Sequence, residues 1–290
     1  MSLLPLFLVV AAAVIHATWN LLSKQAAEAG AVFVAVNNGI ITLLYAPWVI
    51  WLLLRDGMTW SPAIIACILA SAVANLAYTL CLQRGYRVAD LSVVYPVARG
   101  AGPVLSTLGA FLILGEQASP AGLAGLAAVV VGIGLIASNG RLAAFREPAG
   151  MAGVGWGLAT GVLIATYSVI DTWGVKVLEL SPVLLVWFSN LMRLPMLAPV
   201  LLRDPAGAMA RMQGRWGLAL GVGLLAPLSY ILVLWALALG GPLSLVAPLR
   251  ETSMMAAALL GFLVLRERVG PWRLAGCGAV VLGAALLAGA

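Results

Sequence analysis

Two stretches of this chain are alike: LILGEQASPAGLAG at residues 112–125 and LVLRERVGPWRLAG at residues 263–276. At a shift of 151 residues, Glu116 aligns with Glu267, a proline aligns with a proline, and Leu-Ala-Gly recurs in register. Apolar matches arise often by chance in a hydrophobic sequence, whereas a matched acid and a matched proline do not. The two stretches therefore indicate an internal duplication.

Polar and proline matches continue upstream of these stretches at a shift of 152 residues, one residue more. The matched pairs are Lys24 with Lys176, Asn38 with Asn190, Pro47 with Pro199, Tyr78 with Tyr230, Ser92 with Ser244 and Pro96 with Pro248. Because the offset stays constant over most of the chain, we interpret residues 1–145 and 146–290 as two repeats of one unit.

The composition places both repeats in a membrane. Of the 290 residues 63% are hydrophobic and only 9% are charged, whereas a soluble domain has about 25% charged residues. Alternation of polar and apolar residues, the pattern of membrane β-strands, is missing. We therefore predict an all-α integral membrane protein.

Apolar runs of roughly 20 residues, the length that crosses the hydrocarbon core as a helix, predict ten transmembrane helices. They cover residues 3–23, 31–53, 62–83, 90–114, 119–138, 150–172, 181–202, 216–238, 242–265 and 270–288. Since each repeat holds five helices, an odd number, the second repeat enters the membrane from the opposite side. Inverted-topology repeats of this kind are the architecture of many secondary transporters that work by alternating access.

The sequence resembles the EamA-type branch of the drug/metabolite transporter (DMT) superfamily. The resemblance rests on LGEQASPAGLAG and LRERVGPWRLAG, which carry the glutamate and proline after the fourth helix of each half, and on HATWNLLSK at residues 16–24. It covers essentially the whole chain. It implies a central cavity lined by helices 1–4 and 6–9, with the fifth and tenth helices at the periphery. The substrates of this family are diverse, so the resemblance leaves the substrate open.

Five charged residues lie inside the predicted helices: Arg99, Asp171, Arg193, Arg250 and Glu251. Each costs about 2.5–3.5 kcal/mol at a helix centre on insertion scales, so these side chains should face protein or a wet cavity. Polar residues at helical spacing join them on the same faces. Our candidate substrate-binding or gating residues are His16, Trp19, Asn20, Asn38, Asn75, Tyr78, Tyr95, Arg99, Tyr167, Asp171, Asn190, Arg193, Tyr230, Arg250 and Glu251.

Several of these candidates have two open interpretations. Arg99 and Glu251 occupy equivalent positions in the repeats, so they either form an ion pair across the pseudo-two-fold axis or bind substrate. Arg250 and Glu251 should be poor partners for each other, because neighbouring side chains diverge by roughly 100° around a helix. His16, the only histidine, is either a hydrogen-bonded packing residue or a proton carrier. Asp171 either pairs with Lys176 or faces the cavity.

Three interior arginines against two interior acids leave one positive charge in excess, which favours an anion or a zwitterion over a simple cation. We therefore expect a secondary transporter that moves a small organic anion or an amino-acid-like zwitterion across the cytoplasmic membrane, as an exporter. A proton-coupled exporter of drugs or cationic amines is the alternative. A ligand-binding membrane sensor or scaffold without flux is an alternative of another class.

Other classes lack their motifs in this sequence. A membrane enzyme needs a catalytic cluster, and one histidine with scattered acids does not supply it. We expect no cofactor, no metal and no nucleic-acid partner, since the sequence has no nucleotide-binding loop, no paired cysteine spacing and no basic patch. The expected partners are a small-molecule substrate and the lipid bilayer, with proton coupling through Glu251, Asp171 or His16 as a hypothesis. Both a monomer and a homodimer are compatible with the sequence.

The orientation in a bacterial-type cytoplasmic (inner) membrane has two conflicting indications. With ten helices both termini share a side, whose loops carry only Arg55 and Lys176, whereas eleven lysines and arginines lie in the loops of the other side. The positive-inside rule then places the termini outside. The family resemblance implies termini in the cytoplasm.

Overall fold

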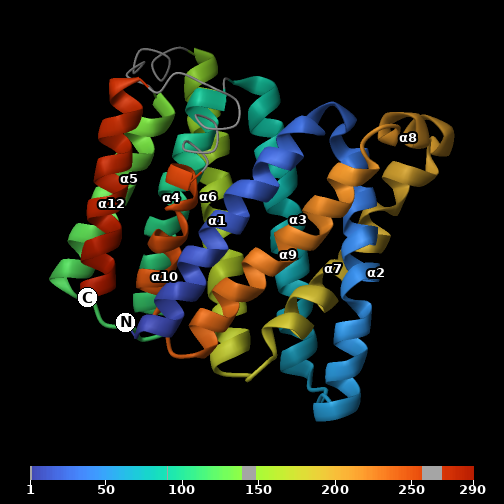
Figure 1. The fold of residues 1–290 in the computed structure, drawn as a ribbon, viewed down its shortest axis with the longest axis horizontal. Helices are drawn as coiled ribbons and strands as arrows, with labels where there is room; N and C mark the ends of the chain where they lie inside the picture. The colour runs from blue at the N-terminus through green and yellow to red at the C-terminus, as the bar shows by residue number, and fades with distance from the viewer. Residues whose placement is uncertain (1, 90, 139–147, 257–269) are drawn as a thin grey trace.

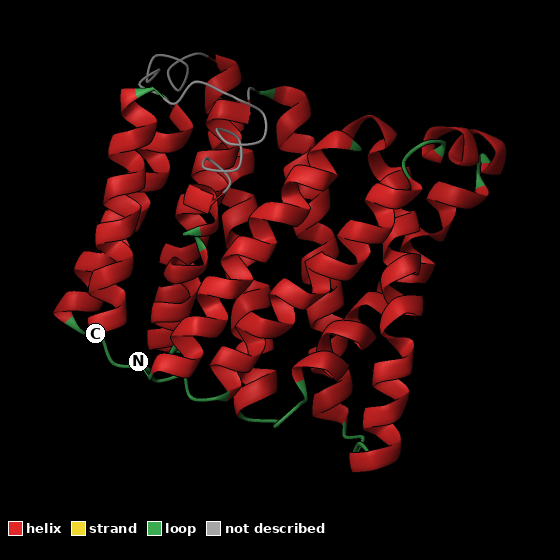
Figure 2. Ribbon diagram, viewed as in Figure 1, coloured by secondary structure: helices red, strands yellow, loops and turns green. Residues whose placement is uncertain are grey.

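A computed structural model describes residues 2–89, 91–138, 148–256 and 270–290, and every regular element in these ranges is a helix (Figure 1, Figure 2). The α-helices are α1 (Leu3–Gln25), α2 (Gly30–Asp56), α3 (Pro62–Val88), α4 (Leu91–Leu112), α5 (Pro120–Ser138), α6 (Pro148–Lys176), α7 (Pro182–Leu202), α8 (Pro205–Met212), α9 (Trp216–Ala238), α10 (Leu243–Arg250) and α12 (Pro271–Gly289). A short 3₁₀ helix, η1 (Ala27–Ala29), joins α1 to α2. The predicted helical class is therefore confirmed.

Proline marks the start of many of these helices, as in α3, α5 and α7. Proline suits the first helical position, because its missing N–H would have no partner there. At the start of α3, the hydroxyl of Ser61 also accepts the N–H of Ile64 at 3.2 Å. These local signals explain why the predicted helix starts agree well with the structure.

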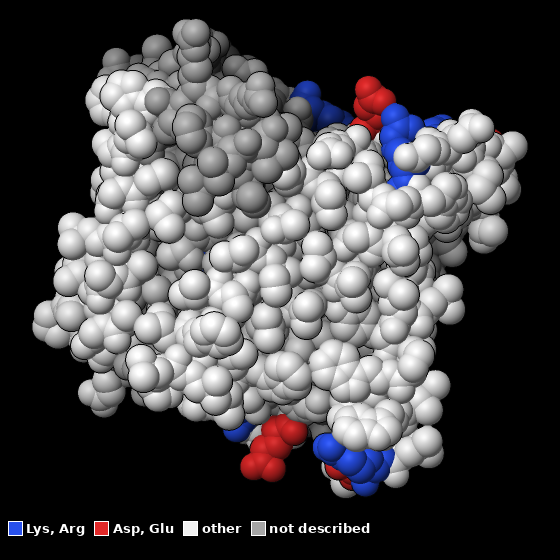
Figure 3. All heavy atoms as spheres, viewed as in Figure 1, with Lys and Arg blue, Asp and Glu red and all other residues white. Residues whose placement is uncertain are grey.

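Within the described residues, six helices are long and apolar enough to cross a membrane: α1, α2, α3, α6, α7 and α9. The outer surface agrees with this reading. Figure 3 shows a broad uncharged band, with lysine, arginine and acidic side chains gathered at its two edges. Large apolar side chains such as Leu43, Leu54 and Leu112 are mostly exposed in this band, as expected for a lipid-facing surface. The protein is a multi-pass membrane protein.

The predicted continuous helix over residues 242–265 is wrong in its first half. Helix α10 ends at Arg250, and Glu251 and Thr252 form a turn before residues 253–256 become helical again. Pro248 lies inside α10 and has no N–H for the carbonyl of Ser244. That carbonyl instead accepts the Thr107 hydroxyl of α4 at 3.4 Å.

Other predicted boundaries also differ from the structure. Helix α3 runs on to Val88, through the predicted break at 84–87, and α6 includes Lys176. The predicted loop after α7 contains the short helix α8, whose first turn is capped by Asp204. The first half of the second signature motif, residues 263–269 with Glu267, lies outside the described residues, as do the loop cations Arg141, Arg146, Arg266 and Arg268.

The helices pack in a small set of pairs. Helix α5 packs along α12, α1 along α9, α3 along α6, and α2 along α7. Helices α5 and α12 approach closely through glycines: a Cβ added at Gly132 would lie 2.8 Å from the carbonyl oxygen of Gly276, and one at Gly283 would lie 2.7 Å from that of Gly125. Figure 1 shows both chain ends at one end of the bundle and α8 at the other.

The signature residue Glu116 holds the N-terminus of α10. Its Oε1 accepts the N–H of Leu243 at 2.7 Å, and its Oε2 accepts the N–H of Ser244 at 2.9 Å. The Nζ of Lys176, at the end of α6, lies 3.3 Å from Oε1. Because α10 has no cap of its own, the carboxylate satisfies N–H groups that otherwise lack partners and places a negative charge at a helix N-terminus.

Burial by itself would raise the pKa of Glu116, but the hydrogen bonds from Ser244 and Leu243 and the charge of Lys176 outweigh it, so this pKa lies below its ordinary value. We expect Glu116→Gln to lower the free energy of unfolding by about 1.5–3 kcal/mol at neutral pH, the contribution of a hydrogen bond to a charged group. The pKa of Glu116 is lower in the folded protein than in the unfolded chain. Its carboxylate therefore stabilises the fold at any pH above the unfolded pKa, and this stabilisation is lost as the pH falls through the folded pKa.

Thermal unfolding in detergent, from neutral pH to below about pH 4, measures this effect. The difference between wild type and Glu116→Gln should shrink on acidification. Glu28→Gln is the matched control, because Glu28 also pairs with an arginine but is largely exposed, and such pairs contribute little. A difference that is independent of pH would contradict the assigned role of the charge.

Candidate functional site

A cavity of about 440 Å³ lies in the centre of the bundle. Helices α1, α2, α3, α4, α6, α7, α9 and α10 all contribute to its wall, whereas α5 and α12 contribute no lining residue. This arrangement agrees with the cavity and the peripheral helices that the family resemblance implies. Its volume is within the range of small-molecule sites, about 300–1,000 Å³.

Fourteen of the fifteen candidate residues line this cavity. The fifteenth, Glu251, is almost fully buried behind the wall, beside Arg99. Sequence analysis missed several lining residues: Ser23, Phe33, Asn37, Gln83, Tyr86, Ser189 and Ser229. Tyr86 was missed because helix α3 was predicted to end at residue 83, whereas it continues to Val88. The others are isolated polar or aromatic residues that carry no charge, so only their helical spacing from a known lining residue could have revealed them.

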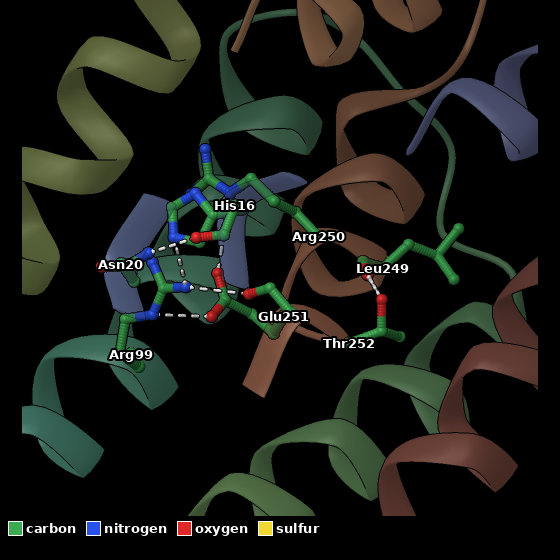
Figure 4. A network of polar contacts seen from close by, with 8 residues as sticks. His16, Asn20, Arg99, Leu249, Arg250, Glu251 and Thr252 are labelled. Carbon is green, nitrogen blue, oxygen red and sulfur yellow. Dashed lines mark hydrogen bonds and ion pairs between the residues drawn. The ribbon is translucent and has the colours of Figure 1, made fainter. Parts of the chain in front are cut away.

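Arg99 and Glu251 form an ion pair, the first of the two interpretations that the sequence left open. The Nε of Arg99 lies 2.9 Å from Oε2 of Glu251, and both side chains are buried (Figure 4). The Nη2 of Arg99 also donates to the hydroxyl of Ser253 at 3.3 Å and lies 3.4 Å from Nε2 of His16. The pair thus joins α4 to the turn after α10.

Arg250 also approaches Glu251, contrary to the prediction that these neighbours diverge. Its Nε lies 3.7 Å from Oε1 of Glu251. The prediction failed because it considered only the directions in which the side chains leave the helix. Glu251 keeps helical backbone angles (φ −71°, ψ −9°), and the contact is made by the ends of two long side chains. Neither arginine Nε is aligned with the carboxylate as a hydrogen bond. One carboxylate therefore serves two guanidinium groups, and one positive charge remains in excess.

A second polar cluster, formed by Asp171, Arg193 and Tyr230, lies on α6, α7 and α9. The Tyr230 hydroxyl donates to Oδ2 of Asp171 at 2.5 Å. Arg193 donates to the side-chain oxygen of Asn190 at 2.7 Å and to the carbonyl of Ser189 at 3.3 Å. Lys176 pairs with Glu116 and not with Asp171. Of the two interpretations of Asp171, the structure therefore supports the one in which it faces the cavity.

Aromatic rings form part of the wall beside this cluster. Tyr167 stands edge-on to Tyr78 and to Tyr230, with ring centroids 5.9 Å apart in each pair. The ring of Tyr95 lies 5.8 Å from the guanidinium carbon of Arg99. Aromatic pairs of this geometry are stable arrangements, so the rings provide a fixed apolar surface between the charged groups.

Asparagines stabilise the remaining wall. The amide of Asn38 donates to the carbonyl of Asn190 at 2.8 Å, across the contact between α2 and α7. The amides of Asn20 and Asn75 donate to carbonyls one turn earlier in their own helices. Trp19 donates its indole N–H to the hydroxyl of Ser229 at 3.3 Å. Most polar groups of the wall are thus held in place by protein partners.

The cavity extends towards the end of the bundle opposite the chain termini. Ser23, Gln83 and Tyr86, near the C-terminal ends of α1 and α3, line it and are only partly buried. Towards the termini, the lining residues Ile41, Leu185 and Arg250 are buried. Access is therefore from the end that carries α8.

Comparisons with known proteins agree with this architecture. The sequence profile of the EamA-like transporter family matches residues 151–289. A crystal structure 17% identical in sequence superposes with a TM-score of 0.76, over 97% of this chain and 95% of that chain; it supports the fold alone. No curated protein sequence gives a significant match.

The shared carboxylate predicts an asymmetry between two variants. Glu251→Gln leaves two buried guanidinium groups without a counter-charge, and removing one partner of a buried ion pair costs about 3–5 kcal/mol. Arg99→Gln should destabilise less, because Arg250 still compensates Glu251.

A double-mutant cycle on the unfolding free energy, measured in detergent, tests this asymmetry. The double variant Arg99→Gln with Glu251→Gln should cost clearly less than the sum of the single variants, since it leaves one uncompensated charge instead of two. Equal costs for the two single variants, with strict additivity, would refute the shared carboxylate.

Proposed function

We propose that this chain, which belongs to the EamA-like transporter family by its residues 151–289, is a secondary transporter of a small organic anion or an amino-acid-like zwitterion. The observation that carries the substrate class is the charge of the cavity. Arg250 shares Glu251 with Arg99, and Arg193 is held by neutral acceptors alone. Two guanidinium groups on the wall are thus available to an anionic group, which arginine binds in a bidentate manner.

The proposed mechanism is alternating access by two inverted five-helix repeats, 1–145 and 146–290, with ten spans in all. The packing supports the repeats, because several of the main helix contacts recur when each helix is exchanged for its counterpart. Helix α3 packs on α6 as α9 packs on α1, while α2 with α7 and α5 with α12 map onto themselves. The contacts between Arg99 and Glu251 and between Asn38 and Asn190 join residues at equivalent repeat positions.

We propose that substrate enters from the cytoplasm and that the protein is an exporter. The cavity extends to the end of the bundle that carries α8 and the C-terminal end of α3, where cations such as Arg84, Arg203 and Arg211 occur. The positive-inside rule assigns this end to the cytoplasm. The observed state is then open to the cytoplasm and closed on the opposite side by the buried layer around Arg250.

Asp171 favours a second candidate, a proton-coupled exporter of cationic amines or drugs. Its carboxylate lies on the cavity wall beside aromatic rings, and both features attract cations. The excess of arginine charge argues against this reading. A ligand-binding sensor without flux is the third possibility.

Counterflow in proteoliposomes separates these functions. Vesicles preloaded with an unlabelled compound are given the same compound in labelled form, using L-malate, 3-phosphoglycerate, L-glutamate, L-leucine and choline as probes. Transient accumulation of an anion or an amino acid supports the proposal, and accumulation of choline alone supports the amine exporter. Binding measured by thermal shift without counterflow of any probe would identify a sensor.

We expect Arg193→Ala to weaken the apparent affinity for the transported probe roughly 10- to 100-fold, the loss of one charge-assisted contact. Arg193→Lys should recover part of this loss, because the positive charge is retained without the planar geometry. Arg215→Ala is the matched control, since Arg215 pairs with Glu28 on the surface, away from the cavity. Normal apparent affinity in a folded Arg193→Ala protein would remove Arg193 from the substrate site.

A further inference from the structure

Three side chains in or beside the cavity can exchange a proton with water: His16 on α1, Asp171 on α6 and Glu251 after α10. Their surroundings differ, and the differences decide which of them can change its charge while the protein stays folded. A buried charge is tolerated only when a partner compensates it.

Glu251 lies between two guanidinium groups. Its two oxygens face Arg99 at 2.9 Å and Arg250 at 3.7 Å. Loss of its negative charge would leave two buried guanidinium groups with no counter-charge. Removing the charge of one partner from a buried ion pair destabilises the protein strongly.

His16 is fixed in its neutral form. Its Nε2 lies 3.4 Å from Nη2 of Arg99, and a guanidinium can only donate hydrogen bonds. The ring nitrogen is therefore the acceptor and carries no proton. A second positive charge on the imidazole would lie directly beside the guanidinium and would be repelled by it.

Asp171 differs from both. Oδ2 accepts the Tyr230 hydroxyl, whereas Oδ1 is buried and has no hydrogen-bond partner in the described part of the chain. Among those same residues, no lysine or arginine nitrogen lies within ion-pair distance of this carboxylate. The groups that face it are Ser71 and Cys67 from α3, Tyr230 from α9, and Arg193 from α7. The charges of α4 and α10, on Arg99 and Arg250, belong to the other cluster.

Arg193 compensates Asp171 from a distance. Its guanidinium acts on the carboxylate through its charge, while its hydrogen bonds go to Asn190 and Ser189 of its own helix. Both side chains line the same cavity. A ligand can therefore reach either charge without first breaking an ion pair between them.

We propose that Asp171 is the proton-binding residue of the transport cycle and that it takes up a proton when the substrate anion binds to Arg193. This step rests on the proposed function. The bound anion then compensates the positive charge of Arg193 in place of Asp171. Asp171 is left as a buried carboxylate without a counter-charge, beside a second anion. A proton on Oδ1, supplied from the aqueous end of the cavity, removes that charge. Anion and proton are then carried together, and Tyr230 remains a hydrogen-bond donor to Oδ2 throughout.

Infrared difference spectroscopy tests the protonation directly. The probe is the anion of the panel above that shows counterflow in wild type, and its addition should produce the carbonyl band of a protonated carboxylic acid. The band should shift when the protein carries ¹³C-labelled aspartate, remain with labelled glutamate, and disappear in Asp171→Asn. Asp56→Asn, which changes an exposed aspartate, should leave the band in place.

Proton movement during transport is the second measurement. With a pH-sensitive dye inside proteoliposomes, uptake of the anion by wild type should acidify the lumen, and Asp171→Glu should retain this acidification because it keeps a titratable carboxyl group. Anion flux without acidification, a missing carbonyl band, or a band that shifts with labelled glutamate would overturn the proposal and leave the transport function intact. Absence of counterflow for every probe would instead overturn the transport function itself.

Discussion

The structure depends on a constraint of the hydrocarbon environment: neither a backbone polar group nor a charge can remain there without a partner. Helix α10 is where this constraint is most demanding, because the helix is short, broken at its end, and buried. Glu116 satisfies its first N–H groups, Thr107 satisfies the carbonyl that Pro248 leaves free, and Arg99 neutralises Glu251 in the turn that follows. All three partners lie on α4 or in the loop after it.

The residues at the end of this helix set the charge beside the cavity. The ends of the Arg250 and Glu251 side chains reach the same region, where Arg99 already lies. The cluster then holds two cations and one anion in a fixed geometry.

The sequence offered the pairing of Arg99 with Glu251 as one of two interpretations, because a repeat with a constant offset relates distant residues directly, and fourteen of its fifteen candidates line the cavity. It failed where a helix departs from continuous geometry. Hydropathy does not reveal the turn after Arg250, and it ended α3 at residue 83, whereas this helix continues through the lining residue Tyr86 to Val88. The role of Glu116 was not predictable either, since its partners are backbone N–H groups, which no side-chain pattern displays.

The repeats give the two halves a common architecture but different chemistry. In and beside the cavity, among the described residues, only the central pair is charged in both halves, and it has opposite signs: Arg99 corresponds to Glu251 at the shift of 152 residues. At the same shift, Asp171 corresponds to Trp19, Arg193 to Ile41 and Arg250 to Ala98. The second half therefore supplies every other charge of the cavity, so that substrate meets a symmetric helical frame with charges from one half only. The neutralised central pair can hold the halves together in each state, while the charges without a counterpart remain free to bind and release.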